Sequence, residues 1–399
     1  MNVTTAMATK QSKHIIPVKE ASPVLISNGA EQVIHYHLGD DFSIVAEDDG
    51  EVIEVDEENQ LIIVKYKNGK YKAIDISTKV VKNGAGGFYL PNTLKCDFKK
   101  GQKFKKNEIL AYHSTFFTND VNGNRFNIGT LAKIAIFSTG ETFEDSAFIT
   151  HKLSKDLGSD IVMKKAVVLK KNSSIENMVK KGQKIKAGDE LIKFETSYEE
   201  DYLNDLLSDI GDDLQEEIKS YGKKPIKSKY TGEIIDIQVF HTVDIEELSP
   251  SLKKVVQEHN KVVSSRKKVL EKYKNEGDNA VYKCGLLYNS ADGKVVTKDG
   301  KIHGEYVGEG VLIEFYIKYQ DIAGIGDKFA NFTALKSIIG NVVPEGEEPF
   351  SLFRPDEEIS TFIPPGAILA RMTPSIILTM LGNKVLVELK RKLQEVYEK

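Results

Sequence analysis

Two adjacent carboxylates are the first residues of this chain whose types and spacing suit chemistry. Glu144 and Asp145 follow the apolar run LAKIAIF, which ends at Phe137 and predicts a buried strand. Carboxylate oxygens are the ligands that Mg²⁺ prefers, alongside water and substrate phosphates. Neighbours on an extended strand point to opposite faces, so we expect one carboxylate to reach a metal and the other to orient it. The pair is a candidate metal site.

The same pair also has a purely structural interpretation. Thr142 and Asp145 match the capping box [ST]-x-x-[DE], with which many helices begin. Spacing alone favours this alternative, in which the two acids only start a helix.

Three cations form the second candidate group. Lys328 and Lys336 lie eight residues apart in AGIGDKFANFTALK, where Gly324 and Gly326 permit a tight backbone. Lysine ammonium groups suit phosphates, although most lysines of a Lys-rich chain are simply solvated. Arg371 stands in the otherwise apolar run PPGAILARM, and a buried arginine needs an anionic partner.

Composition limits the classes of protein that can carry these groups. The chain has 399 residues, 40% of them hydrophobic and 29% charged, which is typical of a soluble globular protein of two or three domains. No secretory signal, membrane-spanning run or CxxC pair is expected, since Cys96 and Cys284 lie far apart. Because the net charge is −4, any contact with nucleic acid must come from local basic patches.

Short alternating strands dominate the first half. Residues 42–76 predict strands with a hairpin turn at Asn68-Gly69. KKGQKFKKNEIL at residues 99–110 recurs as KKGQKIKAGDEL at residues 180–191, which favours compact β-barrels of the sandwich-hybrid type. Biotinyl and lipoyl carriers use a similar pattern, but no EAMKM-like tip for a modified lysine occurs here.

Two helices of opposite charge are expected in the middle of the chain. Residues 198–222 predict an acidic helix with one apolar stripe, and residues 251–275 predict a basic helix with an apolar seven-residue repeat. They either pack against each other by complementary charge or serve as docking arms for a protein partner.

The ordered motifs resemble the C-terminal half of the β subunit of multisubunit DNA-directed RNA polymerases. KKGQKFKKNEILA, GTLAKIAIFSTGETFEDSAFITHKL, GDKFANFTALK and PPGAILARM are similar to the family's KxGdxLA, GxNxxVAFMxWxGYNxEDxxxxSE, GDKxAGRHGNKG and NPxGvPSRM. The opening segments NVTTAMATKQSKHIIPV, SPVLISNG and DISTKVVKN resemble further family blocks. The order is preserved over about 380 residues, which makes the set specific although single motifs are weak.

The resemblance implies roles for individual residues. Glu144 and Asp145 would approach the Mg²⁺ that arrives with the incoming nucleotide, directly or through water. Lys328 and Lys336 would lie near the RNA 3′ end and the phosphates of the growing product, and Arg371 would contact the triphosphate. Lys79 and Lys82 match the stretch NLTKYxRSN and would contact nucleic acid; at Lys82 the family has an arginine, whose planar fork lysine lacks. The principal Mg²⁺ site is expected on the largest subunit.

This sequence also departs from the family pattern. The residues between the two lysines read ANFTAL where the family has AGRHGN, and GETF partly replaces GYN before the acids. The chain begins where the family is halfway through β and ends soon after the SRM-like block. This resembles a split β subunit of the kind that giant bacteriophages encode, acting in the cytoplasm of an infected bacterium or packaged in the virion.

The expected fold is mainly β with inserted helices (α+β). The resemblance implies a connector at residues 1–80, a discontinuous double-psi β-barrel from residues 80–165 and 310–382, a flap-like sandwich-hybrid β module at residues 165–310, and a C-terminal helix at residues 383–399. The implied function is RNA synthesis as one subunit of a larger enzyme, inactive alone.

The implied partners are the N-terminal half of β on a separate chain, β′-like subunits and a sigma-like factor at the flap. DNA template, RNA and nucleotides would complete the assembly, with no membrane contact. Two alternatives stay open: a non-catalytic carrier or scaffold built from biotinyl-lipoyl-like barrels, and a hydrolase that uses the acid pair without partners.

Overall fold

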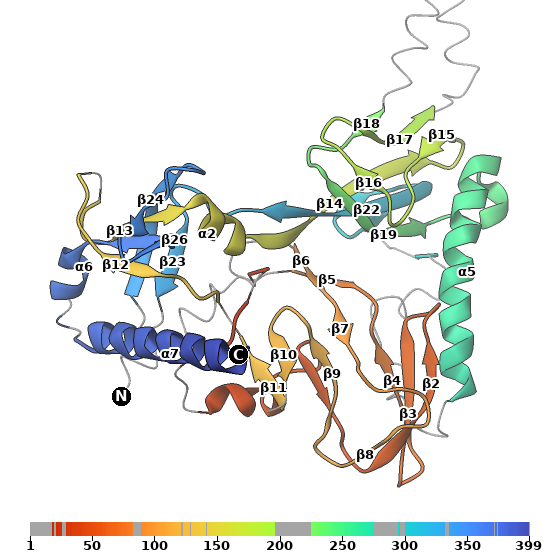
Figure 1. The fold of residues 1–399 in the computed structure, drawn as a ribbon. Helices are drawn as coiled ribbons and strands as arrows, with labels where there is room; N and C mark the ends of the chain where they lie inside the picture. The colour runs from red at the N-terminus through yellow and green to blue at the C-terminus, as the bar shows by residue number, and fades with distance from the viewer. Residues whose placement is uncertain are drawn as a thin grey trace, which may run out of the picture.

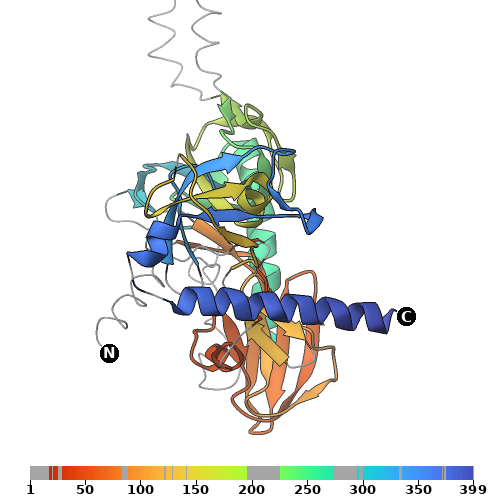
Figure 2. The ribbon, with the colours of Figure 1, turned by 60° about the vertical axis from the view of Figure 1, so that its left-hand side comes forward.

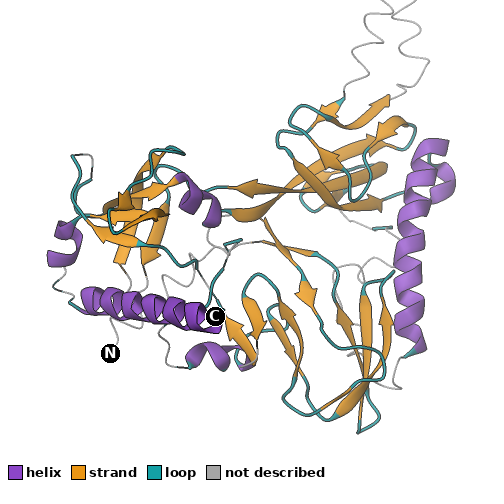
Figure 3. Cartoon of the chain, viewed as in Figure 1, coloured by secondary structure: helices purple, strands orange, loops and turns teal. Residues whose placement is uncertain are grey.

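β-strands dominate the regular structure of the computed structural model, as the sequence predicts. The structure describes residues 18–19, 21–25, 29–82, 89–120, 123–127, 129–140, 142–195, 225–273, 294–295, 300–331, 335–370, 372 and 374–398. The predicted acidic helix at 198–222 and Arg371 lie outside these residues. Figures 1 and 3 show three β-rich regions, of which two are joined by a pair of long strands. No helix among the described residues is both long and apolar enough to cross a bilayer.

The N-terminal region contains two small sheets, with strand orders β4-β3-β2-β8 and β1-β9-β7. The predicted hairpin is confirmed, because β3 pairs antiparallel with β4 and Gly69 takes a left-handed φ of 84° in the turn. Ile62, Val64, Ile74 and Leu110 are central to the apolar core between the sheets. The strands are β1 (Ser43–Val45), β2 (Gly50–Asp56), β3 (Leu61–Tyr66), β4 (Tyr71–Asp75), β7 (Leu94–Lys95), β8 (Lys103–Phe104) and β9 (Ile109–His113).

A six-stranded sheet, ordered β16-β19-β22-β14-β6-β5, forms the middle of the molecule. Its two longest strands, β14 (Ser159–Lys170) and β22 (Gly310–Asp321), pair antiparallel over their full length, which is about 40 Å. At Gly310 a Cβ atom would lie 2.1 Å from the Leu169 carbonyl oxygen, so only glycine permits this close approach. The other strands are β5 (Lys79–Lys82), β6 (Tyr89–Asn92), β16 (Lys184–Ile185) and β19 (Gly232–His241).

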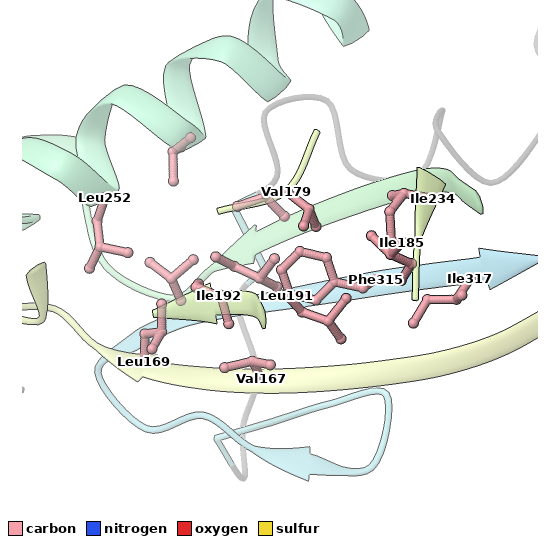
Figure 4. Packing of buried hydrophobic residues seen from close by; sticks show 14 of the residues in the cluster. Val167, Leu169, Val179, Ile185, Leu191, Ile192, Ile234, Leu252, Phe315 and Ile317 are labelled. Carbon is pink, nitrogen blue, oxygen red and sulfur yellow. The ribbon is translucent and has the colours of Figure 1, made fainter. Parts of the chain in front are cut away.

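One end of this sheet packs into a β module that carries the largest apolar core. Residues of β14, β19 and β22 meet those of the small sheet formed by β15 (Ser174–Met178), β17 (Glu190–Glu195) and β18 (Ile226–Lys227). Figure 4 shows Leu191, Ile192 and Phe315 at the centre of this core, with Leu252 reaching it from a helix. All four side chains are at most 1% exposed.

The long helix α5 (Pro250–Lys272) joins this module to the N-terminal region (Figure 1). It matches the predicted basic helix, and it begins after Ser249, whose hydroxyl accepts the N–H of Leu252. Leu252 and Val256 belong to the module core, whereas Leu270 packs with Leu61 and other residues of the N-terminal sheet. Most of the apolar stripe of α5 is therefore covered by its own chain, and its predicted packing against the acidic helix involves residues outside the described ranges.

A third sheet combines residues that are far apart in the chain. Its order is β12-β27-β13-β24-β23, with β12 parallel to β27 and β13 parallel to β24. Residues 134–150 thus pair with residues 338–363 across the inserted module. The strands are β12 (Ile134–Ile136), β13 (Ser146–Thr150), β23 (Lys328–Asn331), β24 (Leu335–Val343) and β27 (Thr361–Ile363). The double-psi topology and the four domain boundaries stay predictions.

Helices α6 (Pro365–Leu369) and α7 (Ser375–Tyr397) supply Ala367, Ile368 and Ile376 to the core of this sheet. The helix predicted at residues 383–399 therefore begins earlier than the sequence indicates. Shorter elements complete the chain: η1 (Ala30–Gln32), η2 (Ile34–Tyr36), β10 (Phe117–Asp120), β11 (Gly123–Phe126), α2 (His151–Asp156), η3 (Ile245–Glu247), β20 (Lys301–Ile302), β21 (Glu305–Tyr306), β25 (Phe350–Ser351) and β26 (Arg354–Glu358).

Candidate functional site

The acid pair occupies a tight turn at the start of β13. The N–H of Ser146 donates to the Phe143 carbonyl at 3.2 Å, which leaves Glu144 and Asp145 as the two central residues of the turn. Glu144 has a left-handed φ of 49°, uncommon for any residue except glycine. Both side chains are exposed. The expectation of an extended strand with carboxylates on opposite faces is therefore wrong at this position.

The preceding strand also differs from the sequence expectation. β12 lies at the edge of its sheet rather than in the interior, and Phe137, just after it, is 59% exposed. An apolar run alone does not distinguish a central strand from an edge strand that faces solvent or another chain.

The capping-box alternative is wrong, because a strand and not a helix follows the acid pair. The Thr142 hydroxyl lies 2.9 Å from the Thr139 hydroxyl, while β13 begins at Ser146. The nearest helix is α2, which begins after Thr150; the hydroxyl of Thr150 accepts the N–H of Leu153 at 3.2 Å. The acid pair is thus free of a helix-starting role.

Both predicted lysines lie on one exposed face of the same sheet. Lys328 opposes Ile338, and Lys336 opposes Ala330, in the antiparallel pair of β23 and β24. Over residues 335–340 of β24 the side chains alternate: Lys336 and Ile338 are exposed while their neighbours are buried. Residues directly opposite each other share a face of a sheet, so Lys328 lies on the same side as Ile338 and Lys336.

The register of β13 places the acid pair next to this exposed face. Ser146 is the partner of Ile338, and the Asp145 carbonyl accepts the N–H of Ile338 at 2.7 Å. Because Ser146 and Lys328 lie two strands apart, their Cα atoms are separated by about 10 Å. A Cβ on Gly340 would lie 2.3 Å from Ser146 Oγ, so Ser146 faces the exposed side as well. The structure therefore brings Glu144, Asp145, Lys328 and Lys336 together.

A short turn fixes Lys328 at the start of β23. Gly326 has a left-handed φ of 92°, and the Asp327 carboxylate accepts the N–H of Gly324 at 2.9 Å. The Asp327 carbonyl accepts the N–H of Ile339, also at 2.9 Å. These bonds join the glycine-containing turn to β24, so the position of Lys328 depends on the turn chemistry that the sequence indicates.

Three of the four charged side chains in this group, those of Glu144, Lys328 and Lys336, are open to a ligand. Within the described ranges, no ion pair engages Glu144, Lys328 or Lys336. Nor does the described part of the chain contain a group of three or more His, Cys, Asp or Glu residues that would hold a metal by itself. Two carboxylates and two ammonium groups on one exposed surface can bind a metal–phosphate ligand if other molecules complete the coordination.

The two other described lysines of the prediction lie on a different sheet. Lys79 and Lys82 lie on β5, the edge strand of the six-stranded sheet. Arg371 lies outside the described residues; in the apolar run before and after it, Ala367 and Ile368 are buried, whereas Leu369 and Met372 are 73% and 86% exposed.

Sequence reasoning missed two exposed apolar residues beside the charged groups. Phe143 precedes the acid pair and is 80% exposed, and Ile338 separates the two lysine positions with 41% exposure. The available signal was the single aromatic residue inside the polar segment STGETFEDS. Apolar side chains in such positions are typical of surfaces that bind another molecule.

A group of charged and polar side chains surrounds the buried Glu314 of β22, the strand that leads to Lys328. Burial alone would raise the pKa of Glu314, but hydrogen bonds from Lys164, Tyr316 and His303 outweigh it, so the pKa is lowered and the carboxylate is charged. Burial and the bond to Glu314 raise the pKa of the Tyr316 hydroxyl. These paired groups are structural, since none lies among the exposed charges described above.

An open groove lies elsewhere, near the end of the six-stranded sheet. It is lined by residues of β14, β16, β19 and β22, including Asp160, Lys184, Lys318 and Tyr319. None of the predicted site residues lines it, and its lysines are interspersed with acids, which does not favour a phosphate site.

Comparison with known proteins identifies the family. A family model described as RNA polymerase Rpb2, domain 6, matches residues 108–397, well over half of the chain and all four residues of the exposed charged group. A comparison with curated proteins gives no match. The chain belongs to the Rpb2 domain 6 family, and it is a β-type subunit of a multisubunit RNA polymerase.

Proposed function

We propose that this chain contributes Glu144, Asp145, Lys328 and Lys336 to the nucleotide-addition centre of a DNA-dependent RNA polymerase. The observation that carries the proposal is the register of β13, β24 and β23, which places the acid pair next to the exposed sheet face that carries the two lysines. The family match supports membership in a nucleotidyltransferase complex. The chain would act only after assembly with other subunits.

The donor set fits Mg²⁺ that arrives with a nucleotide. Mg²⁺ is commonly held by one or two carboxylates together with substrate phosphates and waters, and the turn offers two exposed carboxylates. When bound, the ion would neutralise charge on the phosphates during nucleotide transfer. Glu144 and Asp145 would hold or orient the ion or its waters, while the main Mg²⁺ site belongs to the largest subunit.

The two lysines would hold the polyphosphate and the RNA 3′ end. Lysine supplies a compact positive charge, and both side chains extend from the same face of the sheet as Ser146. Positioning and charge neutralisation are the main contributions that a protein makes to phosphoryl transfer. In the same proposal Arg371 contacts the triphosphate, and Lys79 and Lys82 contact nucleic acid at a separate place.

The assembly and source are part of the proposal as well. We infer an enzyme encoded by a giant bacteriophage, in which β′-like subunits assemble with this chain and a sigma-like factor binds the flap-like region expected at residues 165–310. It would work in the infected cell or the virion. The carrier alternative gains no support from the family match.

Substitution of the acid pair tests the proposal. In the reconstituted polymerase, Glu144→Gln and Asp145→Asn remove negative charge with little change of shape. We expect at least one of them to slow nucleotide addition at limiting nucleotide by about 10- to 100-fold, the usual effect of disturbing groups that orient a metal. Raising the Mg²⁺ concentration is expected to recover part of the loss.

The matched control is Glu345→Gln, which changes another exposed carboxylate of the same region, in the loop after β24. It is expected to leave the rate unchanged. Equal elongation rates for the parent enzyme and both site variants would refute the assignment of the acid pair.

A further inference from the structure

The outward face of α7 is apolar and uncovered by the described part of the chain. Six residues line it, each between 50% and 73% exposed: Leu378, Leu381, Val385, Leu389, Leu393 and Val396. Their spacing averages 3.6 residues, so all lie along one side of a straight helix over about 27 Å. In Figure 2 the C-terminal half of α7 projects beyond the neighbouring sheets.

Other positions of α7 fix the helix to the rest of the molecule. Ile376 is buried in the core of the five-stranded sheet. Further along, Arg354 of β26 donates to the Glu388 carboxylate at 2.6 Å, and Arg391 donates to Glu357 at 3.5 Å. The helix is therefore held with its apolar side outward.

The hairpin that holds α7 also carries exposed apolar residues. Leu352 and Phe353, at the tip between β25 and β26, are 88% and 97% exposed, and Phe350 is 54% exposed. Phe353 directly precedes Arg354, which binds the middle of α7. We call these three residues and the six of α7 the apolar ridge.

The area of the apolar ridge is that of a protein interface. Taking about 100 Å² for each aliphatic and about 200 Å² for each aromatic side chain, the exposed fractions give on the order of 800 Å² of apolar surface. A monomer rarely exposes so large an apolar area, whereas a stable interface uses about 800 Å² on each partner.

We propose that the apolar ridge is the docking surface for an apolar helix of another subunit of the same polymerase. The inference rests on family membership, which makes this chain one part of a multisubunit enzyme, and not on the assignment of the acid pair. The partner helix would lie along α7 and cover the hairpin tip, so that both halves of the ridge are buried together.

The pattern of residues disfavours the other occupants. A coiled coil with a second copy requires apolar residues at alternating steps of three and four, but the steps here are three, four, four, four and three. Nucleic acid and membrane surfaces attract helices whose basic side chains are free. α7 has four basic and two acidic residues, but two of its basic side chains, Lys384 and Arg391, are paired with Glu388 or Glu357.

Site-specific photo-crosslinking in the purified polymerase tests the proposal. A benzoylphenylalanine residue is placed at Phe353, at Leu389 or, as a control, at Val262, which is 59% exposed on α5. We expect positions 353 and 389 to crosslink to the same other subunit, and position 262 not to reach that segment. Crosslinks only to a second copy of this chain, or none in the intact complex, would overturn the proposal.

Loss of subunit retention provides a second, independent readout. Leu389→Gln combined with Phe353→Ser is expected to weaken retention of the docked subunit by about tenfold or more, as loss of large side chains from an interface core does, while Val262→Gln has no effect. The melting temperature of the full chain should stay the same, because the altered side chains are exposed. Glu144→Gln should retain every subunit, so failure of the docking proposal and failure of the active-site proposal are distinguishable.

Discussion

Lys328 and Lys336 differ from other exposed lysines of this chain because strand pairing gives them a shared direction. Their exposed face also contains Ser146, next to the acid pair. Lysines on flexible loops lose side-chain entropy on binding without mutual positioning, whereas two ammonium groups fixed on neighbouring strands can contact successive phosphates. At the scale of single residues, the account therefore predicts an electrostatic contribution from each.

The salt dependence of RNA retention measures this contribution. When the logarithm of the RNA-binding constant is plotted against the logarithm of the salt concentration, each phosphate contact that is lost makes the slope shallower by about 0.7 to 0.9. We expect Lys328→Ala and Lys336→Ala each to give one such decrease in stalled polymerase complexes. Lys103→Ala changes an exposed lysine of β8 in the N-terminal region and should leave the slope unchanged. An identical decrease in all three variants would contradict a specific role for the pair.

Residue types were predictable from the sequence, but local geometry was not. The sequence indicates that Glu144 and Asp145 are special, yet their spacing from Thr142 equally fits a capping box. Which of the two interpretations holds depends on the hydrogen bond from the Ile338 N–H to the Asp145 carbonyl, which joins positions almost two hundred residues apart. The left-handed φ of Glu144 was unpredictable because non-glycine residues seldom adopt it.

Among the elements, α5 connects two regions with separate cores. Its first turns pack in the module core, while its last turns pack on β3 and β4. Arg266 forms a buried ion pair with Asp75 of β4 at 2.7 Å, and the Tyr273 hydroxyl donates to Glu54 of β2. The helix thus restrains the β module that contains β15, β17 and β18 relative to the N-terminal region.

Removing the guanidinium should release only one end of α5. Arg266→Ala leaves the Asp75 carboxylate buried without its cation, which costs about 3 to 5 kcal/mol. We expect faster amide hydrogen exchange in residues 263–272 and unchanged exchange in residues 252–258. Lys268→Ala, which alters an exposed lysine of the same helix, serves as the control. Unchanged protection at residues 263–272 in Arg266→Ala would show that the ion pair does not fix the helix.

Helices were predicted from the sequence better than the surfaces that they expose. Periodicity correctly indicates α5 and a C-terminal helix, because an apolar stripe repeats at 3.6 residues whether it faces the same chain or another. What covers a stripe is decided by tertiary contacts. α5 was expected to meet another helix or a partner, yet β-sheets of its own chain cover most of its stripe, while the stripe of α7 remains exposed.

At the scale of the whole molecule, the long pair β14 and β22 carries the chain out from the charged sheet edge and back again. β13 precedes β14 through α2, and β22 leads directly to the turn before Lys328. The mainly β architecture follows from alternating hydrophobicity. Only the ordered resemblance to polymerase β subunits indicated that residues near 145 and near 330 meet, since periodicity gives no information on such distant pairing.

The most direct test of the central claim is cleavage of this chain by a metal placed in the active centre. When Fe²⁺ replaces Mg²⁺ in the assembled polymerase, hydroxyl radicals cut nearby backbone. The account predicts cuts in this chain within residues 142–148 and 328–338, reduced when excess Mg²⁺ is added. Cuts confined to the N-terminal region, or an uncut chain beside a cleaved largest subunit, would contradict a shared active centre.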